Sequence, residues 1–284
     1  MNSALIIDAH AHIFPEKIAA KAVNAIGEFY NIKMSENGML NCLLANAEKA
    51  GISASVVSST ATVKEQVKSI NRFILSCVSG GAPGSSRPTT LSTLNSPLST
   101  LIGLITLHPD MSIGDIDEEI KFAKDNNLKG IKLHPDFQKF YIDDINAEKI
   151  YSSAQDAGLS VLVHTGDDRY DYSQPARLVR VAKKFKKLKF CGAHFGGYQS
   201  WDKVKCYHET PNVYFDTSSS LFKISEETAA GLIDEFKPER FMFGTDFPMW
   251  NQSEELSRFF RINLSENENN IILSKTALRF YGVS

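Results

Sequence analysis

Short β-rich apolar runs that alternate with helical stretches are the feature that most constrains the fold of this chain. Eight such runs lie at residues 5–10, 53–60, 101–107, 130–134, 159–165, 189–194, 213–219 and 241–247. Helical periodicity fills the intervals between them, for example at 113–126, 146–157 and 175–187. Strands that alternate with helices form βαβ units and a parallel sheet. Eight units predict a closed α/β barrel of the (β/α)8 or TIM type, which typically takes about 250 residues.

The chain length suits one such barrel. An open doubly wound sheet is the competing fold, but no Gly-x-Gly-x-x-Gly motif follows the first predicted strand. We therefore expect residues 1–284 to form a single TIM-barrel domain, with one or two C-terminal helices at 253–284.

Two connections are longer than the others. Segment 14–51 follows the first strand and contains helical patterns at 16–29 and 40–50. Because βα connections lie on the catalytic face of a barrel, this insert is a candidate for substrate selection. Segment 79–100 precedes the third strand and consists mostly of Ser, Thr, Gly and Pro. We expect it to be a mobile loop on the opposite face, with no catalytic role.

Composition excludes several classes of partner. The 31 Lys and Arg residues are balanced by 33 Asp and Glu residues, a formal net charge of −2, which argues against a generally basic nucleic-acid binder. No apolar run reaches the roughly 18 residues that cross a bilayer, and a secretory signal is not expected. The four cysteines are far apart and form no CxxC pair. We expect a cytoplasmic protein that acts on a small-molecule substrate, without nucleic-acid or membrane partners.

The histidines coincide with the predicted strand ends. Six of the seven lie at or just past the carboxyl end of a strand, and His208 is the exception: the six are His10, His12, His108, His134, His164 and His194. In a parallel barrel these ends form the catalytic rim. His108 and His134 each begin a His-Pro-Asp sequence, which also suits a turn and helix start, and we leave His108 out of the catalytic set.

A metal site is predicted from the strand ends. His10 and His12 are two residues apart, so both imidazoles point to the same side of their strand and can reach one cation. His164 and His194 are each the first polar group after another buried run, either can supply a third imidazole, and Asp246 ends the eighth strand. Three imidazoles and a carboxylate suit Zn(II), with Mn, Co or Fe as alternatives. A metal of this kind can make water a nucleophile near neutral pH.

The ordered set of motifs resembles the amidohydrolase superfamily, in the branch that includes aminocarboxymuconate semialdehyde decarboxylase. The resemblance covers nearly the whole chain and rests on DAHAHIFP at 8–15, GIKLHP at 130–135, His164, His194 and FGTDFP at 243–248. It implies a distorted barrel with a metal at its carboxyl-terminal mouth. By the same resemblance His10, His12, His164 and Asp246 are the metal ligands. His194 and Asp246 are the catalytic residues, His194 as acid–base and Asp246 as a proton acceptor.

Two departures from the family pattern affect the prediction. Binuclear relatives often carry a carboxylated lysine at the end of the fourth strand, where Lys132 stands here. Because this branch usually holds one metal, we favour a mononuclear site. Related decarboxylases carry arginines for substrate carboxylates, and Arg169 is the only obvious arginine at the rim.

Further candidates have structural alternatives. Lys132 and His134 share one side of the fourth strand, where substrate contact and packing are equally consistent with the pattern. With Arg169, Trp250 completes the substrate-binding set, although a rim aromatic also packs on helices. Asp8 and Asp216 either orient a ligand imidazole or bond the backbone and core.

These observations predict a metal-dependent hydrolase that uses metal-activated water on a small ester, lactone or amide. A non-oxidative decarboxylase of an unsaturated or aromatic carboxylate is the alternative, because the same ligand set serves both reactions. A barrel that binds metal without turnover is a third possibility. The resemblance also implies a homodimer.

Overall fold

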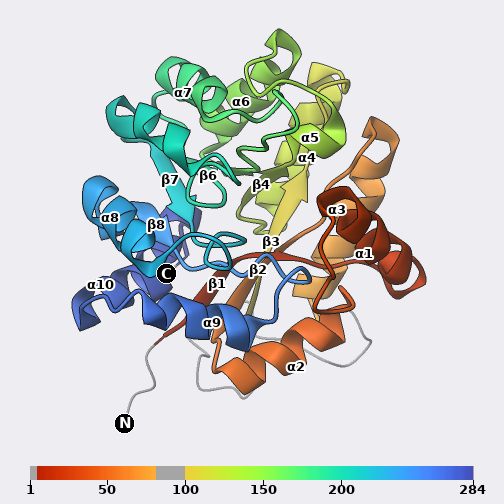
Figure 1. Ribbon diagram of the computed structural model, residues 1–284. Coiled ribbons are helices and arrows are strands. Elements are labelled where there is room, and N and C mark those ends of the chain that lie inside the picture. Colours follow the sequence, from red (N-terminus) through yellow and green to blue (C-terminus); the bar gives the residue numbers. More distant parts are fainter. Residues whose placement is uncertain (1–4, 81–99, 284) are drawn as a thin grey trace.

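The computed structural model describes residues 5–80 and 100–283, in which eight parallel strands follow one another in chain order around a barrel (Figure 1). The strands are β1 (Ile7–His12), β2 (Ala54–Ser58), β3 (Thr100–Thr106), β4 (Gly130–Leu133), β5 (Ser160–Val163), β6 (Phe190–Gly192), β7 (Val213–Asp216) and β8 (Phe241–Met242). Backbone hydrogen bonds close the ring between β1 and the segment that follows β8: Ala9 donates to the Phe243 carbonyl at 2.8 Å, and Asp246 donates to the His10 carbonyl at 2.8 Å. The predicted (β/α)8 barrel is confirmed.

Helices surround the strands, as Figure 1 shows. They are α1 (Glu16–Tyr30), α2 (Leu40–Ala50), α3 (Val67–Val78), α4 (Ile113–Asp125), α5 (Pro135–Gln138), α6 (Ile145–Ala157), α7 (Pro175–Lys184), α8 (Glu226–Phe236), α9 (Gln252–Arg261), α10 (Glu266–Asn270) and α11 (Thr276–Tyr281). Three further described segments form 3-10 helix, η1 (Lys64–Gln66), η3 (Trp201–Glu209) and η4 (Pro238–Arg240), and η5 (Ile271–Lys275) forms π-helix. Within the described ranges, none of these helices combines the length and apolarity needed to span a bilayer.

Local sequence explains where several helices begin. Ser112, Asp144, Ser225 and Asn251 precede α4, α6, α8 and α9, and each side chain accepts a hydrogen bond from a backbone N–H of the first turn. Such an N-cap stabilises a helix by about 1 kcal/mol, because these N–H groups have no partner inside the helix. The cap at Asn251 also ends the loop that carries Asp246.

Two apolar layers hold the barrel together. The outer layer packs the strands against the surrounding helices, for example Val57 and Ile105 with Ile74 of α3. The inner layer fills the barrel with side chains such as Ile7 and Met242, and includes Phe280 and Tyr281 of α11. Strands buried on both faces need continuous apolar runs, which is the pattern that identified them. Because side chains fill the interior, the space for a ligand is at the carboxyl-terminal mouth of the barrel.

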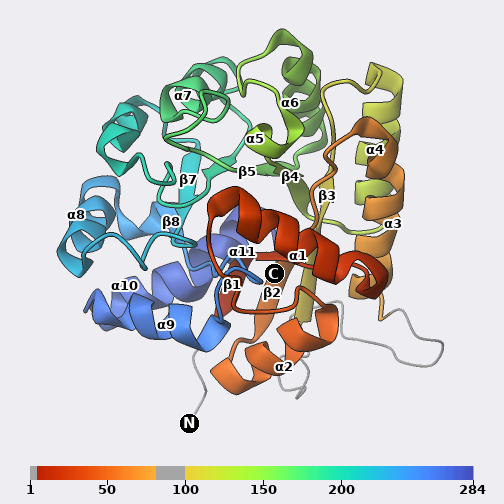
Figure 2. The same cartoon turned by 45° about the vertical axis from the view of Figure 1, so that its right-hand side comes forward.

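The insert after β1 provides one side of that mouth. It forms α1 and α2, and Figure 2 shows α1 crossing in front of the strands. Phe14, Ile26 and Phe29 from this insert line a cavity shared with side chains from the strand ends. The predicted helices of the insert are confirmed. Residues 81–99 of the predicted 79–100 loop lie outside the described residues.

Candidate active site

Five predicted residues meet at the carboxyl ends of the strands. His10 and His12 end β1, His164 follows β5, His194 follows β6 and Asp246 follows β8. All five line the cavity or lie directly behind its wall, and His10, His164 and His194 are buried. The barrel therefore brings together side chains that are up to 236 residues apart in the sequence (246 − 10 = 236).

His10, His12 and Asp246 form the first cluster that can hold a metal. The two Nε2 atoms lie 3.2 Å apart. Asp246 Oδ1 lies 3.6 Å from His10 Nε2 and 3.3 Å from His12 Nε2. These three offer ligand atoms close enough to share one ion, and so do His10, His194 and Asp216.

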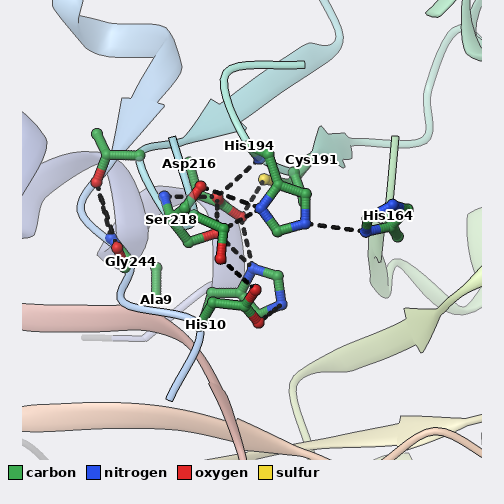
Figure 3. A network of polar contacts seen from close by, with 12 residues as sticks. Ala9, His10, His164, Cys191, His194, Asp216, Ser218 and Gly244 are labelled. Atoms are coloured by element: carbon green, nitrogen blue, oxygen red, sulfur yellow. Dashed lines mark hydrogen bonds and ion pairs between the residues drawn. The ribbon is translucent and has the colours of Figure 1, made fainter. Parts of the chain in front are cut away.

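Hydrogen bonds behind the cluster orient His10. Its Nδ1 lies 2.9 Å from Asp216 Oδ2 and 3.0 Å from Ser218 Oγ (Figure 3). The carboxylate can only accept, so Nδ1 carries the proton and Nε2 keeps its lone pair on the side of His12 and Lys132. A carboxylate behind a histidine is the usual support for a metal-binding imidazole. Asp216 thus fits the orienting alternative.

His164 and His194 face each other in a second pair. His164 Nε2 donates to the Gly166 carbonyl at 2.9 Å, and His194 Nδ1 donates to the Ser218 carbonyl at 3.0 Å. These bonds leave lone pairs on His164 Nδ1 and His194 Nε2, which are 2.9 Å apart (Figure 3). Two facing lone pairs repel unless a proton or metal ion lies near both. The donor set therefore fits a metal, although His164 is outside the three-residue cluster.

Burial sets the charge of these groups. It lowers the pKa of His10 to about 4, and the nearby Lys132 adds to the effect. Burial also holds the pKa of His164 well below its ordinary value. Neutral imidazoles are the form that binds metals. Burial alone would raise the pKa of Asp246, but His10 and His12 keep it well below its usual range, so the carboxylate is ionised.

Lys132 is placed directly beside this cluster. Its Nζ lies 2.8 Å from His10 Nε2, and its side chain is fully buried. Burial lowers the pKa of Lys132 to about 8, against the opposing attraction of Asp246 and Asp216. It is a positive group in the lining of the cavity.

Backbone strain accompanies the two candidate catalytic residues. His194 has φ 62° and Asp246 has φ 58°, both in the left-handed region that non-glycine residues rarely occupy. Each costs about 1 kcal/mol, and such strain often accompanies functional sites. Bonds around the loop hold Asp246: Ser219 Oγ donates to its Oδ2 at 2.6 Å. Asp8 fits its backbone-bonding alternative, because it accepts from Thr245 N–H at 3.0 Å.

The cavity has a volume of about 350 Å³ and is lined by two chemically different sets of residues. The polar set contains three candidate ligands, His12, His164 and Asp246, with Lys132 and His134. The insert after β1 supplies most of the apolar set. The residues of that set are Phe14, Ala22, Ala25, Ile26, Phe29, Met34, Phe137, Pro248 and Met249.

Two predicted substrate-binding residues lie outside this lining. Arg169 donates through its Nε and Nη2 to Asp167, at 2.9 and 2.6 Å, so its charge is already paired. Trp250 donates to Ser219 Oγ at 3.0 Å and stacks on Phe222 with ring centroids 4.7 Å apart. The structure therefore leaves neither side chain facing the cavity, whereas Lys132 and His134 both do.

Sequence reasoning missed Tyr30 and Tyr198, which line the cavity. Tyr30 Oη lies 3.0 Å from His134 Nε2, and its ring packs edge-on against Tyr198. Tyr30 belongs to a helix whose pattern shows only amphipathicity, and Tyr198 follows β6 in a loop without a motif. The position of the insert on the catalytic face was the only available signal.

This chain combines a parallel barrel with a histidine-rich cluster at the carboxyl ends of the strands. That arrangement is typical of barrel enzymes with a metal centre. The family model described as Amidohydrolase matches residues 100–283. The chain belongs to the amidohydrolase family, as its resemblance predicted, and is an enzyme. No curated protein sequence matches it.

Solved structures with the same fold cover almost the whole chain. The 5-carboxyvanillate decarboxylase of Sphingomonas paucimobilis is 14% identical, with a TM-score of 0.72 and coverage of 99% of this chain and 100% of that one. A dihydroxybenzoic acid decarboxylase of a Polaromonas species, solved with manganese and the inhibitor 2-nitroresorcinol, is 14% identical, with a TM-score of 0.70 and coverage of 99% and 97%. A probable 2-pyrone-4,6-dicarboxylic acid hydrolase of Acinetobacter baumannii, solved with citric acid, is 13% identical, with a TM-score of 0.67 and coverage of 98% and 99%.

Proposed function

We propose that this enzyme is a metal-dependent, non-oxidative decarboxylase of an aromatic or unsaturated carboxylate. The observation that carries the proposal is the lining of the cavity, which combines the candidate metal ligands and Lys132 with many apolar and aromatic side chains. Such a space suits a substrate with one anionic end and a planar apolar body. Two of the three structures described above are decarboxylases of aromatic acids, which adds support.

We assign His10, His12, His164 and Asp246 as the residues that hold one divalent ion, Zn(II) or Mn(II). The manganese in a similar decarboxylase favours a metal of this kind. When bound, such an ion supplies positive charge that attracts substrate oxygens and stabilises developing negative charge. Asp216 keeps His10 in the tautomer that this role requires, through its 2.9 Å contact with Nδ1.

The side chains around the ion supply the remaining chemistry. Lys132 attracts the substrate carboxylate to the candidate metal ligands, since its Nζ lies 2.8 Å from His10 Nε2. The bond from ring or chain carbon to the carboxylate breaks, CO2 leaves, and the electron pair stays on that carbon. Protonated His194 then delivers a proton to it from Nε2, because Nδ1 is committed to the Ser218 carbonyl. His194 regains its proton from solvent.

Hydrolysis of an ester, lactone or amide is the second candidate. The ionised carboxylate of Asp246 favours it, since this group faces the cavity and can accept a proton from attacking water. The similarity to a probable pyrone dicarboxylic acid hydrolase points the same way. Arg169 is paired with Asp167, and none of the described residues that line the cavity is an arginine that could bind a second substrate carboxylate.

The test compares both reactions on one preparation. The protein is loaded with Zn(II) or Mn(II) and incubated with 5-carboxyvanillate, dihydroxybenzoic acids and unsaturated carboxylates, and CO2 release is measured. Lactones and amides are assayed in parallel. We expect CO2 release that disappears with a chelator and in His194→Ala, while His208→Ala, at an exposed histidine, retains it. Hydrolysis without CO2 release would establish the second candidate instead. No reaction with metal bound would overturn both.

A further inference from the structure

We propose that Tyr30 is a substrate-contacting residue whose phenolic hydroxyl donates a hydrogen bond to a substrate oxygen in the cavity. This inference rests on the proposed function and deepens it, because it assigns a residue that receives a ring substituent or carboxylate oxygen. Tyr30 is the last residue of α1 and lines the same cavity as His164 and Asp246.

Its neighbour His134 determines what the hydroxyl of Tyr30 can do. His134 is the N-cap of α5, and its Nδ1 accepts from the Phe137 N–H at 3.4 Å. The proton of this neutral imidazole is therefore on Nε2, which donates to Tyr30 Oη at 3.0 Å. Tyr30 accepts in this contact, so its own O–H proton stays available.

The described residues contain no acceptor for that proton, since the contact with His134 is the one side-chain hydrogen bond of Tyr30 in 5–80 and 100–283. Burial and the carboxylates of Asp246 and Asp136 raise the pKa of Tyr30 well above its ordinary value, so the hydroxyl remains protonated. An unused O–H on the wall of a cavity is a donor for a ligand.

A rigid contact holds Tyr30 in this position. Arg169 donates to the Phe29 carbonyl at the end of α1, while two of its nitrogens bind Asp167. Its guanidinium also lies over the rings of Phe29, at 4.5 Å, and Tyr30, at 5.3 Å. Asp167 is buried and follows β5, so the contact joins α1 to the barrel. Arg169 is thus a positioning residue for Tyr30.

The experiment measures ligand binding by the metal-loaded protein. The probe is 2-hydroxybenzoate, and its affinity is determined by calorimetry for wild type, Tyr30→Phe and Tyr151→Phe. The Tyr151 hydroxyl donates to the Ile142 carbonyl at 2.9 Å, and Tyr151 does not line the cavity. Tyr151→Phe is therefore a control that also removes one tyrosine hydroxyl. We expect about ten-fold weaker binding in Tyr30→Phe. We expect no change in Tyr151→Phe. Melting temperature and metal content verify that each variant is folded and loaded.

A double-mutant cycle tests the role of Arg169. If Arg169 acts through Tyr30, then Arg169→Gln weakens 2-hydroxybenzoate binding in wild type and has little further effect in Tyr30→Phe. If the losses of binding free energy in the two single variants add up in the double variant, Arg169 does not act through Tyr30. Equal binding by wild type and Tyr30→Phe would overturn the assignment of Tyr30 while the proposed function stands. Failure of the metal-loaded wild type to bind any aromatic carboxylate would overturn both.

Discussion

At the scale of single residues, buried hydrogen bonds decide which imidazole nitrogen faces the cavity. The Gly166 carbonyl binds one nitrogen of His164, and the Ser218 carbonyl binds one of His194. Asp216 does the same for His10. Each bond fixes a tautomer and leaves the opposite lone pair toward the mouth of the barrel. The candidate metal centre is therefore prepared by groups that do not touch the metal position.

Asp216→Asn tests this preparation. Asp216 Oδ2 accepts from His10 Nδ1 and Oδ1 accepts from the N–H groups of His194 and Ser218. An amide has only one acceptor oxygen, so the variant loses one set of these bonds as well as the charge behind the imidazole. We expect zinc affinity to fall about 10- to 100-fold, measured by competition with a chromophoric chelator. Asp234→Asn, which removes an exposed carboxylate paired with Lys237, is the control and should bind zinc like wild type. Unchanged affinity in Asp216→Asn would show that the carboxylate does not support the ligand.

Metal content tests the assignment of His164. Elemental analysis of wild type should find about one equivalent of a divalent metal, and His164→Ala should lose most of it, because an N3O site without one imidazole is weaker. His208→Ala removes the histidine that pairs with Glu235 at the surface and should retain the metal. A full equivalent of metal in His164→Ala would show that His164 is not a metal ligand. Two equivalents in wild type would point to Lys132 as a bridging ligand.

At the scale of elements, the loops after the strands must pass very close to one another to place the histidines. Gly166 follows His164 with φ +78°, and a Cβ added there would lie 2.4 Å from the Tyr198 nitrogen and 2.5 Å from the Gly197 carbonyl carbon. The loop after β6, which carries His194, continues through these residues. Close backbone contact between the two loops is thus what brings His164 and His194 to 2.9 Å.

Gly166→Ala should disturb this contact, and Gly158→Ala is its matched control. Both glycines have left-handed backbone, φ +78° and +72°, but a Cβ at Gly158 meets nothing within 4 Å. Gly158→Ala should cost only the backbone term, about 1 kcal/mol. Gly166→Ala should lower the free energy of unfolding by clearly more and weaken metal binding as well, in urea titrations and metal analysis. Equal losses of unfolding free energy in the two variants would show that the two loops accommodate the added methyl group at little cost.

At the scale of the whole molecule, stability depends on pH through charges buried in the core. Glu255 of α9 is 1% exposed and pairs with Arg258. Burial raises its pKa from 4.5 to about 7, although Arg258 opposes the shift. Because the folded protein holds this proton more tightly than the unfolded chain, ionisation of Glu255 destabilises the fold. The cost is absent below about pH 4.5, grows between pH 4.5 and 7, and is complete above pH 7.

Glu255→Gln removes this titration. The variant should gain stability relative to wild type as pH rises from 5 to 8, by up to about 3 kcal/mol, since each unit of pKa shift corresponds to about 1.4 kcal/mol. The difference in unfolding free energy is measured in urea at several pH values, which cancels the titration of all other groups. A difference that stays constant over this range would show that Glu255 does not titrate in the folded protein.

Much of the barrel and of the candidate metal site could be predicted from the chain, because both follow from local order. Each strand has its own apolar run, and His10, His12, His164, His194 and Asp246 each stand where a run ends. A parallel barrel collects all such ends at one mouth, so position along each strand was sufficient to group these residues. The reaction could not be predicted in the same way, because the same metal ligands serve hydrolysis and decarboxylation. The side chains of the cavity around the substrate decide between the two reactions.

Only the tertiary structure decided which other side chains reach that cavity. Arg169 stood at the rim by sequence, yet its guanidinium is paired with Asp167 and turned toward the end of α1. Tyr30 lies 134 residues before His164 (164 − 30 = 134) and carries no motif, yet α1 places it on the cavity wall. A strand end has one direction dictated by the pleat, whereas the docking of an inserted helix depends on contacts between distant segments. The sequence alone therefore determined the barrel and its ring of histidines, and tertiary packing decided which other side chains line the cavity.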